Sequence, residues 1–211
     1  MLTEERQAWS SGCARVAGVD EAGRGPLAGP VFAAAVCFPS GLFAAGIPSK
    51  LVGLTDSKKL SAAQRDRYFD QLVQLPDIDY GIACADVAEI DEINILQATW
   101  RAMHRAVDGL KQSPDLVLVD GPHLPKWPYP SRPLVRGDSR SLSIAAASVL
   151  AKVSRDRAML DLDRRYPNYG FARHKGYGTK AHLEALRRYG PAPCHRRSFR
   201  GVVVDPSSGD G

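Results

Sequence analysis

The chain has 211 residues, of which 44% are hydrophobic and 24% are charged, and it carries a net charge of +5. This length and composition are ordinary for one large globular domain, or for one domain with a small appendage, and they exclude a chain that needs disulfides or metal to fold. Glu4, Glu5 and Arg6 lie where a secretion signal would be apolar, and prolines and glycines interrupt the most apolar region, 26–47, which excludes a membrane span there.

Two strand-like segments come first in the chain. An apolar stretch at 16–20 has the length of a buried strand, and a glycine- and proline-rich turn at 22–26 follows it. A second apolar run at 31–38 also has strand length, so the two segments predict a hairpin with a wide loop. Further along, Ser61 and Gln64 form the capping box that predicts the start of a helix.

Strands and helices alternate in the rest of the chain. Apolar residues recur at three- and four-residue steps between 93 and 107, which predicts a long amphipathic helix. An uninterrupted apolar run at 116–119 ends in Asp120 and is typical of a buried central strand. The other predicted segments are a strand at 80–87, a proline-rich loop at 121–133, and helices at 141–166 and 179–189. A hairpin followed by such alternation indicates a mixed sheet with helices on its faces.

Positive charge is concentrated near the end of the chain. Residues 173–200 include eight basic residues and one acid, Glu184, so this stretch carries +7 and the remainder of the chain carries −2. The eight are Arg173, Lys175, Lys180, Arg187, Arg188, Arg196, Arg197 and Arg200. Such a basic stripe is typical of a surface that binds the phosphate backbone of a nucleic acid, although a solvated basic face has the same composition.

The four cysteines are scattered, with no Cys-x-x-Cys pair and no spacing typical of zinc. They are Cys13, Cys37, Cys84 and Cys194. This pattern is typical of reduced thiols in a cytoplasmic protein. We also expect that the protein does not contact a membrane and that it is a monomer.

Acidic residues stand at the ends of two predicted strands. Asp20 and Glu21 close the first strand, and Asp120 closes the strand at 116–119. Burying an unpaired carboxylate is costly, and the ends of adjacent strands lie about 5 Å apart. At about 4 Å two such charges repel by roughly 4 kcal/mol at an effective dielectric of about 20, so a divalent cation is expected to offset the repulsion. All-oxygen ligands favour Mg²⁺ or Mn²⁺ over zinc.

The membership of Glu21 and of a fourth carboxylate depends on the local geometry of the chain. Consecutive strand residues face opposite ways, so Glu21 joins Asp20 only if the chain leaves the strand at the glycine turn. The fourth position is open between Asp138, just before the helix at 141–166, and Asp156 within it. The two are 18 positions apart, about 27 Å along a continuous helix, so both cannot reach one site. Asp138 is slightly favoured, although it could instead cap the helix, because arginines flank Asp156.

The turn at Gly23-Arg24-Gly25 resembles a dinucleotide-binding loop only superficially. The third glycine of that motif would fall at position 28, which is Ala28, and prolines on both sides oppose a helix. The glycines are better explained by close approach of bare backbone to a ligand. Exposed amides beside a metal site would bind sugar hydroxyls and phosphate.

Motifs along nearly the whole chain resemble one protein family. In order they are VDEAGRGP at 19–26, TDSKKL at 55–60, NILQAT at 94–99, VDG at 119–121, SIAAAS at 143–148, AKV at 151–153, RD at 155–156, HKGYGT at 174–179 and HRRSF at 195–199. This series is similar to that of ribonuclease HII, the type 2 ribonuclease H family. Because the motifs keep their order over almost all residues, the resemblance is specific.

The resemblance implies an α/β fold with a ribonuclease H-like mixed sheet flanked by helices and a helical C-terminal extension. We expect a catalytic core at 1–170, a basic helical part at 171–204 that packs on the core and completes the substrate site, and a disordered tail at 205–211. The implied activity is endonucleolytic, metal-dependent hydrolysis of the RNA strand of RNA/DNA hybrids. It extends to single ribonucleotides in duplex DNA, as in replication and repair, and leaves 3′-hydroxyl and 5′-phosphate ends.

The same resemblance implies a role for each site residue. The expected metal ligands and catalytic residues are Asp20, Glu21, Asp120 and Asp138, which resolves the fourth position against Asp156. The ribose 2′-hydroxyl at an RNA–DNA junction is expected to contact Gly23, Arg24, Gly25 and Tyr177. Phosphates are expected to contact Lys58, Lys59, Lys175, Arg196 and Arg197. We expect a mechanism with two Mg²⁺ or Mn²⁺ ions about 3.5–4 Å apart at the scissile phosphate.

Two alternatives remain open at the level of the sequence. A non-catalytic nucleic-acid-binding module would explain the basic stripe, but its strand-end carboxylates would repel phosphate. Another ribonuclease H-like nuclease would share the carboxylates and would cut all-DNA duplexes as readily. A Ser/His/Asp hydrolase is disfavoured because the chain has no Gly-x-Ser-x-Gly motif.

Overall fold

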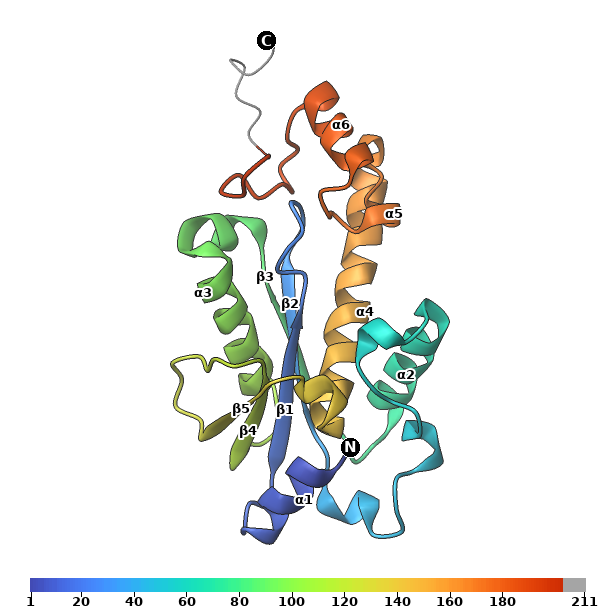
Figure 1. Cartoon of the computed structure of the whole chain (residues 1–211), viewed down its shortest axis with the longest axis vertical. Coiled ribbons are helices and arrows are strands. Elements are labelled where there is room, and N and C mark those ends of the chain that lie inside the picture. The colour runs from blue at the N-terminus through green and yellow to red at the C-terminus, as the bar shows by residue number, and fades with distance from the viewer. Residues whose placement is uncertain (203–211) are drawn as a thin grey trace.

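A mixed sheet of five strands lies at the centre of the computed structural model, which describes residues 1–202 (Figure 1). The strands are β1 (Val16–Ala22), β2 (Val31–Cys37), β3 (Asp79–Ala85), β4 (Leu116–Asp120) and β5 (Ser131–Leu134). They lie in the order β3-β2-β1-β4-β5. The pairs β1/β2 and β2/β3 are antiparallel, whereas β1/β4 and β4/β5 are parallel. The predicted hairpin and mixed sheet are therefore confirmed.

Helices cover both faces of this sheet, with α3 on one side and α4 and α2 on the other (Figure 1). The helices are α1 (Thr3–Ser10), α2 (Ala62–Gln74), α3 (Val87–Asp108), α4 (Leu142–Arg165), α5 (Phe171–His174) and α6 (Lys180–Tyr189). Short 3₁₀ turns lie at η1 (Ser40–Phe43), η2 (Ser49–Leu51), η3 (Ser57–Lys59), η4 (Gly137–Ser139) and η5 (Pro167–Tyr169). The capping box predicted at Ser61 and Gln64 starts α2.

Alternating residues of β2 divide the core into two layers. Ala34 and Val36 pack with α4 and α2, whereas Ala33 and Ala35 pack with α3. This follows from the two-residue period of a strand. Small side chains in β2 and in the first turns of α4 let the helix approach the sheet closely, and this approach brings one face of α4 beside the end of β1.

The start of α4 is anchored by the N-terminal helix, α1. The carboxylate of Glu5 is fully buried and its Oε1 accepts hydrogen bonds from Ser141 Oγ at 2.6 Å and from the Ser143 backbone amide at 2.9 Å. Ser141 Oγ in turn accepts from the Ile144 amide and caps the helix. A buried acid is favourable at this end of a helix because free amides concentrate positive charge there.

Three elements differ from the sequence prediction. The strand β5 lies within the region predicted to be a proline-rich loop, and its Pro133 is tolerated because β5 is an edge strand. The helix α1 had no counterpart in the prediction. The helix α3 begins at Val87, earlier than predicted, and Asn94 interrupts it with a φ of 68°.

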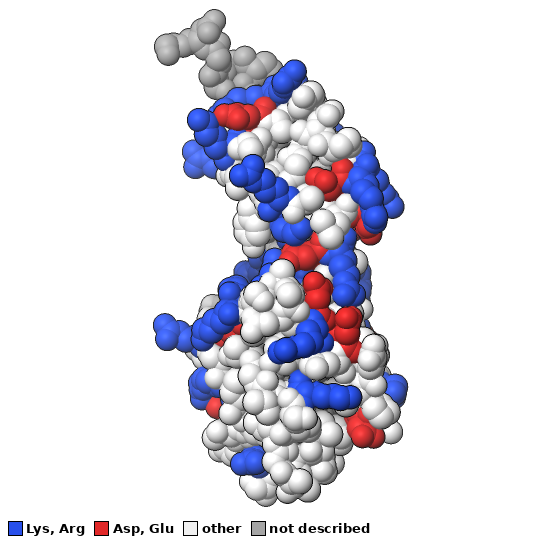
Figure 2. Space-filling view, turned by 90° about the vertical axis from the view of Figure 1, so that its right-hand side faces the viewer, with Lys and Arg blue, Asp and Glu red and all other residues white. Residues whose placement is uncertain are grey.

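The C-terminal part, which we define as residues 171–202, packs at the far end of α4 and extends the molecule along its long axis (Figure 1). It also contacts the loop at 23–30, where backbone bonds join Leu27 to Gly176 and to Arg196. Figure 2 shows many Lys and Arg side chains on this part. The tail predicted at 205–211 lies outside the described residues, as do 203 and 204. No helix among the described residues is long and apolar enough to cross a membrane.

Candidate active site

The register of the central strands brings the predicted acidic residues to one end of the sheet. Val19 of β1 pairs with Val119 of the parallel strand β4, so Asp20 and Asp120 follow side by side. Asp138 reaches the same region from η4, whose Gly137 amide donates to Asp120 Oδ1 at 2.7 Å. Residues far apart in the chain therefore meet because parallel strands present their carboxyl ends at the same edge.

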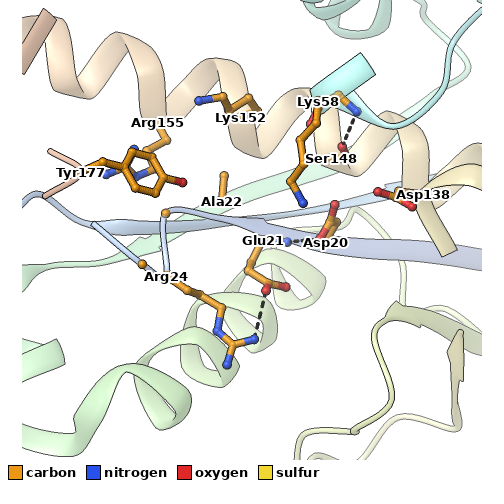
Figure 3. Close-up of a pocket in the computed structure, with 13 residues that line it drawn as sticks. Asp20, Glu21, Ala22, Arg24, Lys58, Asp138, Ser148, Lys152, Arg155 and Tyr177 are labelled. Carbon is orange, nitrogen blue, oxygen red and sulfur yellow. Dashed lines mark hydrogen bonds and ion pairs between the residues drawn. The ribbon is translucent and has the colours of Figure 1, made fainter. Parts of the chain in front are cut away.

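These acids border two neighbouring cavities. The larger, of about 360 Å³, is lined by Asp20, Glu21, Ala22, Gly23, Arg24, Gly25, Ser57, Lys58, Asp138, Ser148, Lys152, Arg155 and Tyr177 (Figure 3). The smaller, of about 170 Å³, is lined by Glu21 and Asp120 together with Arg24, Trp100 and His123, among others. Glu21 and Arg24 line both cavities, so the two adjoin, and we refer to the pair as the hollow.

The electrostatics of the hollow are dominated by buried negative charge. The pKa of Asp20 is raised well above its usual value, first by burial and then by repulsion from Glu21, Asp120 and Asp138. Burial also raises the pKa of Glu21 and Asp138, with repulsion from Asp120 adding to both shifts. Ionised carboxylates are unfavourable in this site because they are buried and repel one another, so the site attracts a cation that would offset the repulsion.

Three of the four carboxylates have a separate hydrogen-bond donor. Asp20 Oδ1 accepts from the Glu21 amide at 2.7 Å, Glu21 Oε1 pairs with Arg24 at 3.3 Å, and Asp120 is held by Gly137. Within residues 1–202, no three His, Cys, Asp or Glu side chains form a ready metal-ligand cluster. The strand β1 continues to Ala22, so Glu21 does not leave the strand as the sequence argument required, and its side chain is turned toward Arg24 (Figure 3). Glu21 nevertheless lines the same cavity as Asp20 and repels its charge.

Lys58 supplies positive charge to the hollow that the carboxylates border. Its amine points toward Asp20 and Glu21 (Figure 3), and its charge lowers the pKa of Glu21 and Asp138. The turn η3 positions this side chain: Asp56 accepts from the Lys58 amide at 2.9 Å, and the Ser57 amide donates to Ser148 Oγ of α4 at 3.1 Å. Lys58 therefore lies where an anionic substrate would approach the acids.

The glycine turn and Tyr177 form one wall of the hollow. Gly23 has a φ of +97°, and a Cβ atom there would lie 1.9 Å from Arg155 Nε, so no other residue fits. A Cβ on Gly25 would lie 3.7 Å from the Tyr177 ring, which is 48% exposed. The expected sensing residues Gly23, Arg24, Gly25 and Tyr177 are thus brought together beside the carboxylates.

The five expected phosphate contacts are not equivalent. Lys58 lines the hollow, whereas Lys59 is exposed and does not line it. Arg197 is also exposed, and its backbone amide donates to the Asp91 carboxylate. The Lys175 amine donates to the Ala172 carbonyl. Arg196 is fully buried and donates only to backbone carbonyls, so direct contact between Arg196 and phosphate, as the sequence analysis expected, is wrong for this structure.

Sequence reasoning missed the contribution of α4. Ser148, Lys152 and Arg155 all line the hollow. Their spacing of four and then three residues places them on one helical face, and this periodicity was the available signal. Asp156, the rejected alternative, pairs with Lys152 at 2.7 Å and lines a different cavity with Arg157, whereas Asp138 lies in the hollow.

Comparison with known proteins identifies the relatives of this chain. The family model for ribonuclease HII matches residues 17–202. Ribonuclease HII of Chlamydia pneumoniae is 52% identical over 202 residues, which cover 96% of this chain and 91% of the relative. Ribonuclease HII of Syntrophotalea carbinolica is 54% identical over 198 residues, which cover 94% and 91%.

Solved structures share the same fold. Ribonuclease H2 from Pyrococcus horikoshii superposes with a TM-score of 0.72 at 28% identity, and the match covers 89% of this chain and 95% of that one. Bst-RNase HIII, solved in complex with Mn²⁺, has a TM-score of 0.67 at 18% identity and covers 92% of this chain and 70% of its own. At that lower identity the likeness shows the fold alone.

Proposed function

Because the chain belongs to the ribonuclease HII family, we propose that the carboxylate hollow is its catalytic centre and acts at ribonucleotides within duplexes. The protein is an endoribonuclease that acts on the RNA of RNA/DNA hybrids. The observation that supports the proposed centre is the register of β1 and β4, which places Asp20 beside Asp120, with Asp138 nearby.

The residues of this centre fit divalent cations, and Bst-RNase HIII, which shares the fold, was solved in complex with Mn²⁺. Asp20, Glu21, Asp120 and Asp138 offer only oxygen ligands, and a cation would offset the repulsion that raises the pKa of three of them. We assign these four as the ligands of two Mg²⁺ or Mn²⁺ ions. The ions, when bound, would lower the pKa of the attacking water and stabilise the leaving 3′ oxygen.

Some of the other residues of the hollow bind and orient the substrate. Lys58 and Lys152 are placed to attract the phosphate backbone. The turn at 23–25 and Tyr177 are placed to contact the sugar next to the scissile phosphate, and the 2′-hydroxyl is the atom that distinguishes RNA from DNA. We propose that these contacts allow cleavage at a single ribonucleotide in duplex DNA, leaving 3′-hydroxyl and 5′-phosphate ends.

The rest of the proposal concerns the organisation of the chain. Residues 1–170 are proposed as the catalytic core, and the basic part that begins at residue 171 is proposed to complete the substrate site through Tyr177. Four free cysteines among the described residues support a cytoplasmic location. We propose that the active form is a monomer.

A cleavage assay with mapped ends tests the function. Three labelled duplexes of one sequence are compared: all DNA, DNA with one ribonucleotide, and an RNA/DNA hybrid. With Mg²⁺ or Mn²⁺, the protein should cut the two ribose-containing duplexes and leave the all-DNA duplex intact, and chelator should stop both reactions. Cleavage of the all-DNA duplex at a similar rate would instead show a DNA nuclease, and binding without cleavage would show a binding module.

Asp120→Asn is the decisive variant in this assay. Replacing the carboxylate with an amide of similar shape removes one charged ligand, so cleavage with Mg²⁺ should be lost. Retention of full activity would overturn the assignment of the centre.

A further inference from the structure

Two arginine side chains are buried directly beneath the loop at 23–30. Arg196 is fully buried and Arg155 is 1% exposed, and neither forms an ion pair with any residue in the described part of the chain. A buried charge without a counter-ion is costly. The catalytic steps proposed above use neither guanidinium, so the presence of both under one loop requires a separate explanation.

Arg196 binds the loop through its whole guanidinium group. Nη2 donates to the Gly23 carbonyl at 2.6 Å, Nη1 to the Arg24 carbonyl at 2.8 Å, and Nε to the Gly29 carbonyl at 2.9 Å. Arg155 binds the next part of the loop through the carbonyls of Ala28 and Pro30, and it also binds that of Lys175. Five carbonyls of one loop are therefore directed toward two buried cations.

Directing the carbonyls inward leaves backbone donors of the turn available to a ligand. Within residues 1–202, the amides of Arg24 and Gly25 make no hydrogen bond, and both residues line the hollow. The two positive charges beneath the turn make it favourable for oxygen atoms with negative or partial negative charge. Burial, and repulsion from Arg155, lower the pKa of Arg196 to about 9, so it remains a cation at neutral pH.

Resting on the proposed function, we infer that Arg196 is a positioning residue that holds the backbone of the turn at 23–25 in the conformation that reads the sugar-phosphate of a ribonucleotide. Its planar fork binds the Gly23 and Arg24 carbonyls together, which a lysine amine on a single flexible stem cannot reproduce. Arg196 acts through this backbone and does not touch the substrate. The basic C-terminal part thereby controls a loop that is some 170 positions earlier in the chain.

The test compares Arg196→Ala and Arg196→Lys with the wild type and with Arg165→Ala. Arg165 is exposed at the end of α4, so its replacement removes the same charge away from the site. Fluorescence anisotropy with Ca²⁺ measures the affinity for an all-DNA duplex and for the same duplex with one ribonucleotide. The readout is the ratio of the two affinities, which a loss of folded protein does not change, and thermal unfolding of each variant is recorded alongside.

Wild type and Arg165→Ala should bind the ribonucleotide-containing duplex more tightly, and both Arg196 variants should lose this preference. Arg196→Lys should retain more of the overall affinity because it keeps the charge. In the cleavage assay, kcat/KM at the single ribonucleotide should fall by about 10²-fold in Arg196→Ala, as a small displacement of positioning groups does elsewhere. If the alanine variant does not fold, Arg196→Lys alone decides the question.

Three results would overturn the inference. One is an unchanged affinity ratio in folded Arg196→Lys, and another is equal affinity of the wild type for both duplexes. The third is a loss of the preference for the ribonucleotide-containing duplex in Arg165→Ala that is as large as the loss in the Arg196 variants. A wild-type protein that discriminates in binding but cuts neither duplex would instead contradict the proposed function and leave the role of Arg196 standing.

Discussion

The carboxyl group of Asp20 is buried among other acids, and its protonation affects the stability of the fold. Its pKa is raised by burial and by Glu21, Asp120 and Asp138. Between the ordinary Asp pKa of about 3.9 and the raised value, the folded protein holds a proton that the unfolded chain has released. The stability contributed by this group is therefore fully present below about pH 4 and is lost as the pH rises through the raised pKa.

Asp20→Asn should therefore stabilise the metal-free protein while it abolishes cleavage. In chelator, the variant should unfold at a higher temperature than the wild type once the pH exceeds the raised pKa of Asp20, because the ionised carboxyl group is unfavourable there. The difference should shrink toward pH 4, where both side chains are uncharged. Added Mg²⁺ should raise the unfolding temperature of the wild type more than that of the variant. Thermal unfolding across pH checks this, and a variant whose advantage in unfolding temperature did not grow as the pH rises would contradict it.

Asp138 and Asp156 form a matched pair for a test of the fourth acidic position. Asp138 lies in the hollow, and its pKa is raised by burial and by repulsion from Asp120, whereas Asp156 pairs with Lys152 and lines a separate cavity. Asp138→Asn should reduce kcat with Mg²⁺ by about 10²-fold or more, the scale on which electrostatic groups act. Asp156→Asn should change kcat by less than about threefold, because Asp156 pairs with Lys152 and does not line the hollow. Equal losses of kcat in the two variants would contradict the assignment of Asp138 as the fourth acidic residue.

At the scale of elements, the close approach of α4 to β1 holds the site together. A Cβ atom on Gly18 would lie 2.2 Å from the Ile144 amide nitrogen and 2.3 Å from the Ser143 carbonyl carbon. Both neighbours are backbone atoms at the start of α4, so a side chain at position 18 cannot be accommodated by a rotamer change. Any enlargement would push α4, with Ser148 and Lys152, away from Asp20.

Gly18→Ala should lower the free energy of unfolding by about 3 kcal/mol or more, the upper range for overpacked cores. It should also reduce cleavage, because α4 would shift relative to β1. Gly41→Ala is the control, since a Cβ there meets nothing within 4 Å and the residue has no positive φ. Denaturant unfolding of both variants gives the comparison. Similar stabilities for the two variants would show that α4 and β1 can move apart to accommodate a Cβ atom at little cost.

Local sequence signals predicted most elements and explain those that were missed. Ser61 with Gln64, and the apolar runs of β1, β2 and β4, act through neighbouring residues, so they can be read directly from the chain. The edge strand β5 depends on pairing with β4, which no local pattern reveals, and its Pro133 indicates a loop. The break in α3 at Asn94 has a local cause, since Asn94 Oδ1 accepts from the amides of Leu96 and Gln97 and caps the second segment.

The whole molecule joins a sheet domain to a C-terminal part, and the sequence revealed less about this junction. The strand-end acids were predictable because the ends of parallel neighbours must meet. The burial of Arg196 could not be predicted, because the sequence does not show whether an arginine in a basic stripe faces solvent or the carbonyls of a distant loop. The role of α4 in the hollow depends likewise on which helical face meets β1.

Within the C-terminal part, buried histidines join the loop that carries Tyr177 to α6 and to the segment at 190–199. The Ala192 amide donates to His195 Nδ1 at 2.9 Å, His195 Nε2 lies 3.0 Å from His182 Nε2, and His182 Nδ1 lies 2.9 Å from the Tyr177 carbonyl. His174 stacks on His182 at 4.5 Å between ring centroids. This chain of bonds requires neutral rings, since each of its acceptor nitrogens would be lost on protonation.

Acid should therefore loosen the C-terminal part before the sheet unfolds. Burial lowers the pKa of His195 from 6.5 to about 4 and also lowers that of His182. Between these values the unfolded chain binds more protons than the folded one, so the stability that His195 contributes is fully present above about pH 6.5 and is lost as the pH falls toward 4. The loss for one such group reaches about 3 kcal/mol.

Hydrogen exchange measured by mass spectrometry at pH 7.5 and pH 5, corrected for intrinsic rates, gives the test. At pH 5, peptides from α6 and residues 190–199 should lose protection while those from β1 and β4 keep it. Because a glutamine at position 195 does not titrate, His195→Gln should flatten this pH dependence. His104→Gln should not, since His104 is half-exposed on α3, away from the junction. Equal loss of protection in β1 and in α6 at pH 5 would mean that the two parts unfold as one unit, and the histidine link would then have no separate role in holding Tyr177.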